Sequence, residues 1–151
     1  MNKKVLAFIY NEKKRKFLIL KTGDSNEELH GPSEWYTVTG SVEKGESHEN
    51  AVKREVKEET NLEVKEVYPL QWGCIYEWQG EEHEELYFIA FADSENVKLD
   101  NIEVINYKWL DLDEFVELIK WDDDKKVLKE VLKKAVKKDL HFKKRSITDY
   151  R

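Results

Sequence analysis

The stretch that decides the fold runs from Gly40 to Leu62 and reads GSVEKGESHENAVKREVKEETNL. It opens as a loop in which Gly40 and Gly45 allow a tight path, with the backbone close to a ligand. Ser47 is a suitable N-cap for a helix that the sequence predicts over Ser47–Thr60. Asn61 follows at the position where helices often end in a left-handed residue, a place for glycine or asparagine. The sequence therefore predicts a glycine-bounded loop followed by one short, capped helix.

Three glutamates on this helix are placed to act together. Glu55, Glu58 and Glu59 stand at i, i+3 and i+4, so at about 100° per residue they share one helix face. Ala51 points the same way, and its small side chain leaves room above the carboxylates. Like charges gathered in this way repel by roughly 0.2–0.5 kcal/mol per exposed pair, and a hard divalent cation such as Mg²⁺ offsets that repulsion. The face is therefore predicted to be a place where a metal ion meets phosphate.

The alternative is an acidic face on a solvated surface helix, which is the more common reading of three glutamates taken alone. The glycine-bounded loop before the helix favours a ligand site instead, because it lets backbone approach a ligand closely. The glycine spacing is faintly similar to a phosphate-binding P-loop, but Glu46 stands where that loop requires lysine. A P-loop is therefore excluded.

The spacing of these residues resembles the Nudix box, G-x5-E-x7-R-E-U-x-E-E-x-G-U, in which U is bulky and apolar. The matching positions are Gly40, Glu46, Arg54, Glu55, Val56, Glu58, Glu59 and Leu62. Asn61 departs from the box, which has glycine there, but asparagine also tolerates the left-handed conformation. The chain is thus similar to Nudix hydrolases, and the resemblance implies a single domain over residues 1–151 with an α/β fold, a Nudix-type α/β/α sandwich around a mixed β-sheet.

The resemblance also implies roles for the residues of the box. Mg²⁺ or Mn²⁺ would be bound by the helix glutamates, with the carbonyl of Gly40 as a further ligand. Arg54 would hold Glu55 in place and has Glu46 as a further partner. The metal would polarise phosphate oxygens and help to generate a hydroxide, while a carboxylate takes the proton of the attacking water; which carboxylate does so stays open. The catalytic set expected from the box is Arg54, Glu55, Glu58 and Glu59.

A further glutamate outside the box is usual in this family, and the candidate is Glu103. It opens the segment Glu103–Leu110, which resembles the stretch before the last strand in bacterial Nudix pyrophosphohydrolases of dihydroneopterin triphosphate and dNTPs. We expect Glu103 to be both a metal ligand and a catalytic residue. An ordinary loop glutamate is the other reading, and Glu84 and Glu85 are the alternative candidates.

Residues that bind the rest of the substrate are harder to recognise. Lys21 ends a predicted strand and is a candidate phosphate contact, although an exposed lysine is the plainer reading. Trp35 and Tyr36 are candidates for stacking on a base or pterin ring, as are Trp72 and Trp78. Most aromatic residues in a small domain belong to its core, so each of these has a structural alternative.

The remaining pattern predicts an alternation of strands and closing helices. The predicted strands are Val5–Tyr10, Phe17–Lys21, Trp35–Thr39, Leu62–Trp72, Cys74–Trp78, Glu85–Ala92 and Tyr107–Leu110, and the closing helices are Leu112–Lys120 and Lys125–Leu140. The first two strands are expected to form a hairpin, and the turn-rich residues 79–82 a second one. Such an order suits a sheet with helices on both sides.

Composition limits the class of protein. The 151 residues are 40% hydrophobic and 38% charged, with 26 basic and 32 acidic residues and a formal net charge of −6. An acidic domain is a poor candidate for duplex DNA, because that binding neutralises many phosphates with Lys and Arg. The single cysteine, Cys74, fits a reducing compartment and is expected to be a buried apolar residue. No signal or membrane-spanning segment is recognisable, so we expect a cytoplasmic protein that does not bind membranes; its oligomeric state stays open.

The sequence thus predicts hydrolysis of a nucleoside triphosphate or pterin triphosphate to the monophosphate and pyrophosphate. A dinucleoside polyphosphate hydrolase shares the box and is the alternative enzyme. A module that senses a nucleotide without cutting it is the alternative from another class, and the full set of box carboxylates disfavours it. The four histidines do not form a His-Glu-x-x-His zinc pattern, and His83 is expected at the surface.

Overall fold

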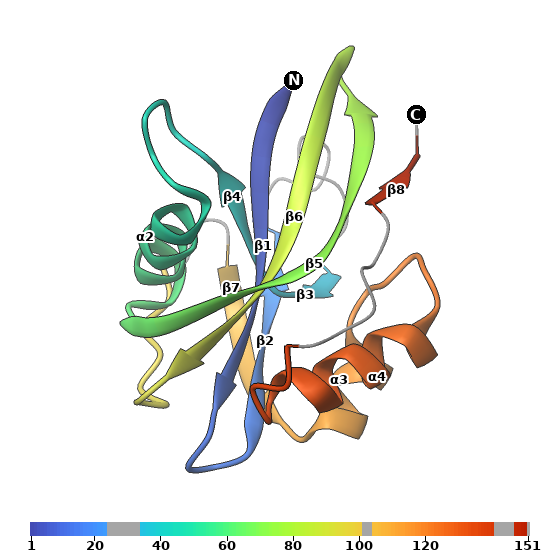
Figure 1. The fold of residues 1–151 in the computed structure, drawn as a ribbon. Coiled ribbons are helices and arrows are strands. Elements are labelled where there is room, and N and C mark those ends of the chain that lie inside the picture. The colour runs from blue at the N-terminus through green and yellow to red at the C-terminus, as the bar shows by residue number, and fades with distance from the viewer. Residues whose placement is uncertain (24–33, 101–103, 141–146, 151) are drawn as a thin grey trace.

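The computed structural model describes residues 1–23, 34–100, 104–140 and 147–150, and Figure 1 shows their arrangement. The strands are β1 (Asn2–Asn11), β2 (Lys16–Thr22), β3 (Glu34–Tyr36), β4 (Val38–Ser41), β5 (Val64–Trp78), β6 (Glu81–Ala92), β7 (Val104–Leu110) and β8 (Ile147–Asp149). The helices are α2 (His48–Thr60), α3 (Leu112–Leu118) and α4 (Lys125–Ala135). Among the described helices, none is both long and apolar enough to cross a membrane.

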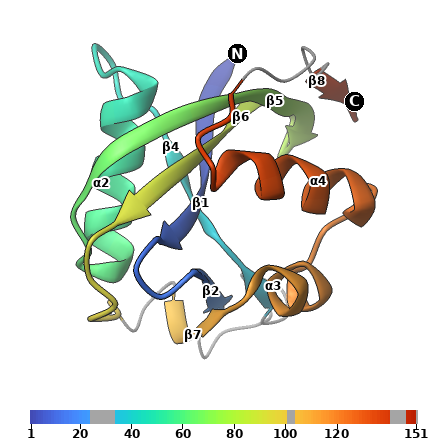
Figure 2. The same cartoon turned by 60° about the horizontal axis from the view of Figure 1, so that its bottom comes forward.

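The strands form one mixed sheet in the order β3-β2-β1-β6-β5-β8, with β4 also paired to β1 and β7 also paired to β2. β1 runs parallel to β6, and β5 parallel to β8, while the other pairs are antiparallel. Helix α2 covers one face of this sheet, and α3 and α4 cover the other (Figure 1, Figure 2). The expected α/β fold with a mixed sheet between helices is confirmed.

Alternation along the strands gives each face its own core. On β1, Leu6 and Phe8 pack in a cluster with residues of α3 and α4. Val5 and Ala7 alternate with them in the sequence and pack in a second cluster with residues of α2. Successive side chains of a strand point to opposite faces, so one apolar strand supplies both clusters. The same rule decides which polar residues of the central strands face which helix.

The strands differ from the prediction in several places. The two strands predicted over 62–78 are one strand, β5, whose register with β6 shifts between Pro69 and Gly73. At this irregularity Gly73 lies so close to β6 that a Cβ would overlap the backbone carbonyl of Glu85, so the position requires glycine. The single strand predicted over 35–39 is divided into β3 and β4, because the chain changes partner from β2 to β1 at Thr37. The short strand β8 was not predicted, since it pairs with β5 only through tertiary structure.

Helix α2 forms as its capping residues predict. Ser47 accepts a hydrogen bond from the backbone N–H of Asn50 at 3.1 Å, and so satisfies one free donor of the first turn. Asn61 ends the helix in the left-handed region, with φ of 64°, and its N–H bonds the carbonyl of Lys57. Asparagine therefore takes the place of the glycine of the box without changing the helix end. The last helix, in contrast, ends at Ala135 and not at Leu140 as predicted.

Candidate active site

Arg54 joins the loop before α2 to the helix itself. Its Nε and Nη2 atoms donate to the two carboxylate oxygens of Glu46 at 2.9 and 3.0 Å. Nη1 donates to Glu55 at 2.8 Å and to Glu58 at 3.4 Å, and Nη2 also donates to the carbonyl of Ser41 at 2.8 Å. A planar guanidinium suits this pattern because its donors form a fixed fork. Arg54 thus fixes both the loop and the carboxylates beside it.

The charges of this network stabilise one another. The hydrogen bond from Arg54, with another from the backbone N–H of Glu43, lowers the pKa of Glu46 to about 2. The hydrogen bond to Glu46 in turn raises the pKa of Arg54, against the effect of desolvation. Both groups are therefore ionised at any pH at which the protein would work. The loop is held further by the Glu46 N–H, which donates to the carbonyl of Glu43, and by Gly45, whose φ of +80° favours glycine.

The end of β4 lies directly against the carboxylate of Glu55. A Cβ at Gly40 would overlap the carboxyl group of Glu55, so no residue but glycine fits without displacing that side chain. The Glu55 side chain is 13% exposed and lies between this backbone and the guanidinium of Arg54. Gly40 is therefore required for close approach, as its place in the box implies, and not for its φ.

The other two helix glutamates differ in exposure. Glu59 is buried at 6% exposure, one turn after Glu55. The side chain of Glu58 is 57% exposed and extends toward Arg54. Within the described ranges, no three acidic, histidine or cysteine side chains are already gathered around one point that could hold a metal ion. The donor chemistry nevertheless fits a hard divalent cation, because Glu55 and Glu59 stand at i and i+4 of α2 and the carboxyl group of Glu55 lies beside the backbone of Gly40.

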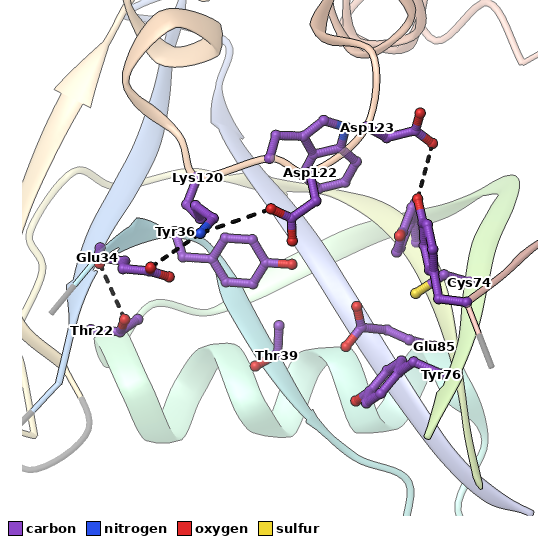
Figure 3. A pocket seen from close by; sticks show the side chains of 13 residues that line it. Thr22, Glu34, Tyr36, Thr39, Cys74, Tyr76, Glu85, Lys120, Asp122 and Asp123 are labelled. Atoms are coloured by element: carbon purple, nitrogen blue, oxygen red, sulfur yellow. Dashed lines mark hydrogen bonds and ion pairs between the residues drawn. The ribbon is translucent and has the colours of Figure 1, made fainter. Parts of the chain in front are cut away.

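A cavity of about 520 Å³ opens on the opposite face of the sheet, toward α3 and α4 (Figure 3). Its lining comes from residues far apart in the sequence: Thr22, Glu34, Tyr36, Thr39, Cys74, Tyr76, Glu85, Tyr87, Lys120, Trp121, Asp122, Asp123 and Tyr150. Five of these side chains are aromatic, so the walls suit a flat ring.

Hydrogen bonds fasten the segments around this cavity. The backbone N–H of Lys120 donates to the carbonyl of Trp35 at 2.8 Å, and its ammonium reaches Glu34 at 3.3 Å (Figure 3). Tyr150, which follows β8, donates its N–H to the carbonyl of Ile75 at 2.7 Å and its hydroxyl to Asp123 at 3.3 Å. The segment between α3 and α4 and the end of the described chain therefore form two sides of the cavity.

Strand β4 joins the cavity to the α2 face. Thr39 lines the cavity, and the next residue, Gly40, lies against Glu55 on the other face. Consecutive strand residues point to opposite faces, so the two sites meet across a single strand. Among the described strands, β4 pairs with β1 alone, so none of them is hydrogen-bonded to its other edge. A ligand that passes over this edge would contact both sites.

Glu85 is the buried carboxylate among the described residues that line the cavity. It is 7% exposed, and burial raises the pKa of its carboxyl to about 7, although Lys4 acts in the opposite direction. In Figure 3 its carboxyl group points toward the interior of the cavity, near Thr39 and Tyr76. Burial also raises the pKa of Tyr76 and of Tyr36, and in each case the charge of Glu85 adds to the shift.

The substrate-binding candidates fall in different places. Tyr36 lines the cavity as a stacking residue should. Trp35 lies outside the lining, half-buried, with the ammonium groups of Lys21 and Lys108 over its ring at 5.8 and 5.0 Å. Lys21 is also outside the lining. Trp72 is a buried core residue and Trp78 is 56% exposed, whereas Glu103 lies outside the described residues.

Most of the cavity could not be recognised from the sequence. Cys74 and Tyr76 on β5, with Glu85 and Tyr87 on β6, lie at alternate positions, and that spacing was the available signal. Cys74 is buried as expected. His83 was expected at the surface, which is wrong: it is 5% exposed and stacks on Tyr76 at a centroid distance of 5.2 Å.

Comparison with known proteins defines the class. The model of the NUDIX domain matches residues 2–131, so the chain belongs to the NUDIX family. The chain is 40% identical to a dihydroneopterin triphosphate diphosphatase of Escherichia coli K12 over 60 aligned residues. These residues make up 40% of this chain and 36% of that protein. The chain is 33% identical over 84 positions to an NAD-capped RNA hydrolase NudC of Actinobacillus succinogenes, 56% of this chain and 31% of that protein. The aligned segments thus cover about a third of these relatives.

Solved structures share the fold over most of the chain. The binary complex of a C. elegans Ap4A hydrolase has a TM-score of 0.68 at 23% identity and covers 94% of this chain and 100% of its own. The E. coli dihydroneopterin triphosphate pyrophosphohydrolase has a TM-score of 0.68 at 24% identity and covers 87% of this chain and 95% of its own. At these identities the likeness establishes the fold, a Nudix fold.

Proposed function

We propose that this protein hydrolyses a nucleoside triphosphate or pterin triphosphate to the monophosphate and pyrophosphate, with Mg²⁺ or Mn²⁺. The observation that carries the proposal is the meeting of two sites across β4. Gly40 lies against a carboxylate of α2, and Thr39 beside it opens into an aromatic cavity. A molecule with a flat ring at one end and phosphates at the other matches this arrangement. The local identity to a dihydroneopterin triphosphate diphosphatase supports the same substrate class.

In this proposal the metal ligands are Glu55, Glu58, Glu59, the carbonyl of Gly40 and Glu103. The bound cation would neutralise phosphate charge and lower the pKa of a coordinated water. Arg54 acts through the glutamates, because its bonds to Glu46 and to the carbonyl of Ser41 fix the position from which it holds Glu55. It is a positioning residue, and the identity of the general base stays open among the carboxylates.

Specificity in the proposal comes from the cavity. Tyr36 would stack on the ring, and Lys21 with Trp35 would lie near the entry side at the β2–β3 pair. The partner is thus a small nucleotide-like phosphate, with neither duplex nucleic acid nor a membrane involved. We place the protein in the cytoplasm, where its single free cysteine would stay reduced.

A substrate panel tests the proposal. Purified protein with Mg²⁺ is offered nucleoside triphosphates, dihydroneopterin triphosphate, dinucleoside polyphosphates and NAD-capped RNA, and pyrophosphate is assayed beside mononucleotide products. Release of pyrophosphate from the triphosphates is the expected result. Turnover confined to dinucleoside polyphosphates would support the alternative enzyme. Tight nucleotide binding with no turnover on the whole panel would support a sensing module.

A further inference from the structure

One buried carboxylate has no role in the proposed chemistry. Glu85 faces the cavity at 7% exposure, and no hydrogen bond or ion pair to its carboxylate occurs within the described ranges. A buried carboxylate without a hydrogen-bond or ion-pair partner is unfavourable, and such groups cluster at sites that bind or transform a ligand. The burial of Glu85 therefore indicates a ligand group that donates hydrogen bonds to its carboxylate.

Its position separates Glu85 from the α2 carboxylates. The sheet register pairs Ser41 with Lys4 and Lys4 with Glu85, so two strand spacings, roughly 10 Å, separate β4 from Glu85. Its side chain lies on the α3–α4 face, whereas Glu55 lies on the α2 face. Glu85 is thus unsuited to the metal site for which it was an alternative candidate. It lies instead where the ring of a substrate would be when its phosphates are near Gly40.

The surrounding side chains define the shape of that ring site. Tyr36, Tyr76, Tyr87 and Trp121 contribute flat apolar walls, and Tyr87 packs against Trp121 with centroids 5.5 Å apart. Such walls accept the faces of an aromatic ring and leave its edge to polar groups. Glu85 is the buried carboxylate among the lining residues, so it meets that edge.

The chemistry of a carboxylate limits which ring edge it can bind. An ionised carboxylate only accepts hydrogen bonds, so its two oxygens match two neighbouring donors. Guanine and pterin have a ring N–H beside an exocyclic amino group, which gives that pattern. Adenine and cytosine present a ring acceptor beside their amino group, and uracil and thymine present one N–H between two carbonyls.

We propose that Glu85 accepts two parallel hydrogen bonds from the ring N–H and the amino group of a guanine or pterin, and so selects triphosphates of this ring type. The inference rests on the proposed function for the reaction, but it concerns ring recognition alone. Burial raises the pKa of Glu85 to about 7, and two donors from a ligand would favour its ionised form.

The test compares ring types in the variant Glu85→Gln. Glutamine keeps the size but replaces one acceptor with a donor, which opposes one of the two ring donors and suits an adenine edge. We expect kcat/KM for GTP and dihydroneopterin triphosphate to fall about 10- to 100-fold, with ATP unchanged or improved. The matched control is Glu77→Gln, an equal charge change at an exposed position on β5, and it should leave all substrates unchanged.

Binding of non-hydrolysable GTP and ATP analogues, measured by calorimetry without metal, separates this inference from the reaction itself. Preference of the wild type for the GTP analogue, lost in Glu85→Gln, supports it even if no substrate is cleaved. Equal affinity for the two analogues in the wild type, no binding of either, or an equal loss on all rings in a variant at least as stable as the wild type would overturn it.

Discussion

The two faces of the sheet differ in how far apart in the sequence their candidate functional residues lie. On the α2 face, residues 40–59 supply the whole described network, and Arg54 bonds partners no more than 13 positions away. On the α3–α4 face, the cavity combines side chains from Thr22 to Tyr150. A face built from neighbours in the sequence keeps a fixed spacing that can be recognised directly. A face built from distant strands shows only alternation until the sheet register is known.

The comparison predicts that the α2 face acts on the phosphates and the cavity face on the ring. The largest expected effect on turnover lies on the α2 face. Glu59→Gln removes a charged oxygen ligand from the proposed metal site, so turnover should fall about 100-fold or more on every substrate. Steady-state pyrophosphate release measures this. Glu63→Gln, an exposed glutamate just beyond the same helix, serves as the control. Wild-type activity in Glu59→Gln would contradict the assignment of the active site to α2.

Gly40→Ala should have the next largest effect. The added Cβ would overlap the carboxyl group of Glu55, so that side chain must move by an ångström or so from its place beside β4. Displacements of that size can reduce turnover about 100-fold. A full kinetic profile together with a melting curve checks the prediction. A variant with normal kcat would show that contact between Gly40 and Glu55 has no part in catalysis.

Arg54→Lys tests positioning on the same face. Lysine keeps the charge but cannot donate to both oxygens of Glu46 while also holding Glu55. We expect kcat to fall about 10-fold and the Mg²⁺ concentration for half-maximal rate to rise, since partners of ligands tune metal affinity. An Mg²⁺ titration of rate measures both. A lower melting temperature with an unchanged Mg²⁺ requirement would indicate a merely structural role.

On the cavity face the expected effect is on stability, and the substitution should stabilise the protein. Burial raises the pKa of Glu85 from 4.5 to about 7, so the folded state is disfavoured above pH 7, where the group must ionise, and is unaffected below pH 4.5. The stability gained by Glu85→Gln should therefore be larger at pH 8 than at pH 4 by about 3 kcal/mol. Urea unfolding at both pH values measures it. Equal gains at the two pH values would show that burial does not penalise the Glu85 charge.

The same difference explains what the sequence could predict. Helix α2 and its caps follow from Ser47 and Asn61, because capping depends on residues only a few positions away. Two of the partners of Arg54, Glu55 and Glu46, follow from the box, whereas the carbonyl of Ser41 does not. The place of β8, the burial of His83 and the cavity around Glu85 depend on which strands become neighbours, and local pattern does not determine that.

The proposed cation site at Glu55, Glu58 and Glu59 is a further case. The sequence predicts three carboxylates on one face, whereas the described structure has Glu58 extended toward Arg54 and largely exposed. Like charges separate unless a counter-charge holds them together, and a guanidinium supplies part of that charge here. The position of each carboxylate with bound metal therefore stays a prediction, as does the part of Glu103.

The most direct test of two separate sites is one assay: pyrophosphate release from GTP and from ATP by the wild type, Glu59→Gln and Glu85→Gln. We predict that Glu59→Gln loses activity on both nucleotides alike, and that Glu85→Gln loses it on GTP alone. If both variants change the two rates by the same factor, the faces do not act on different ends of the substrate.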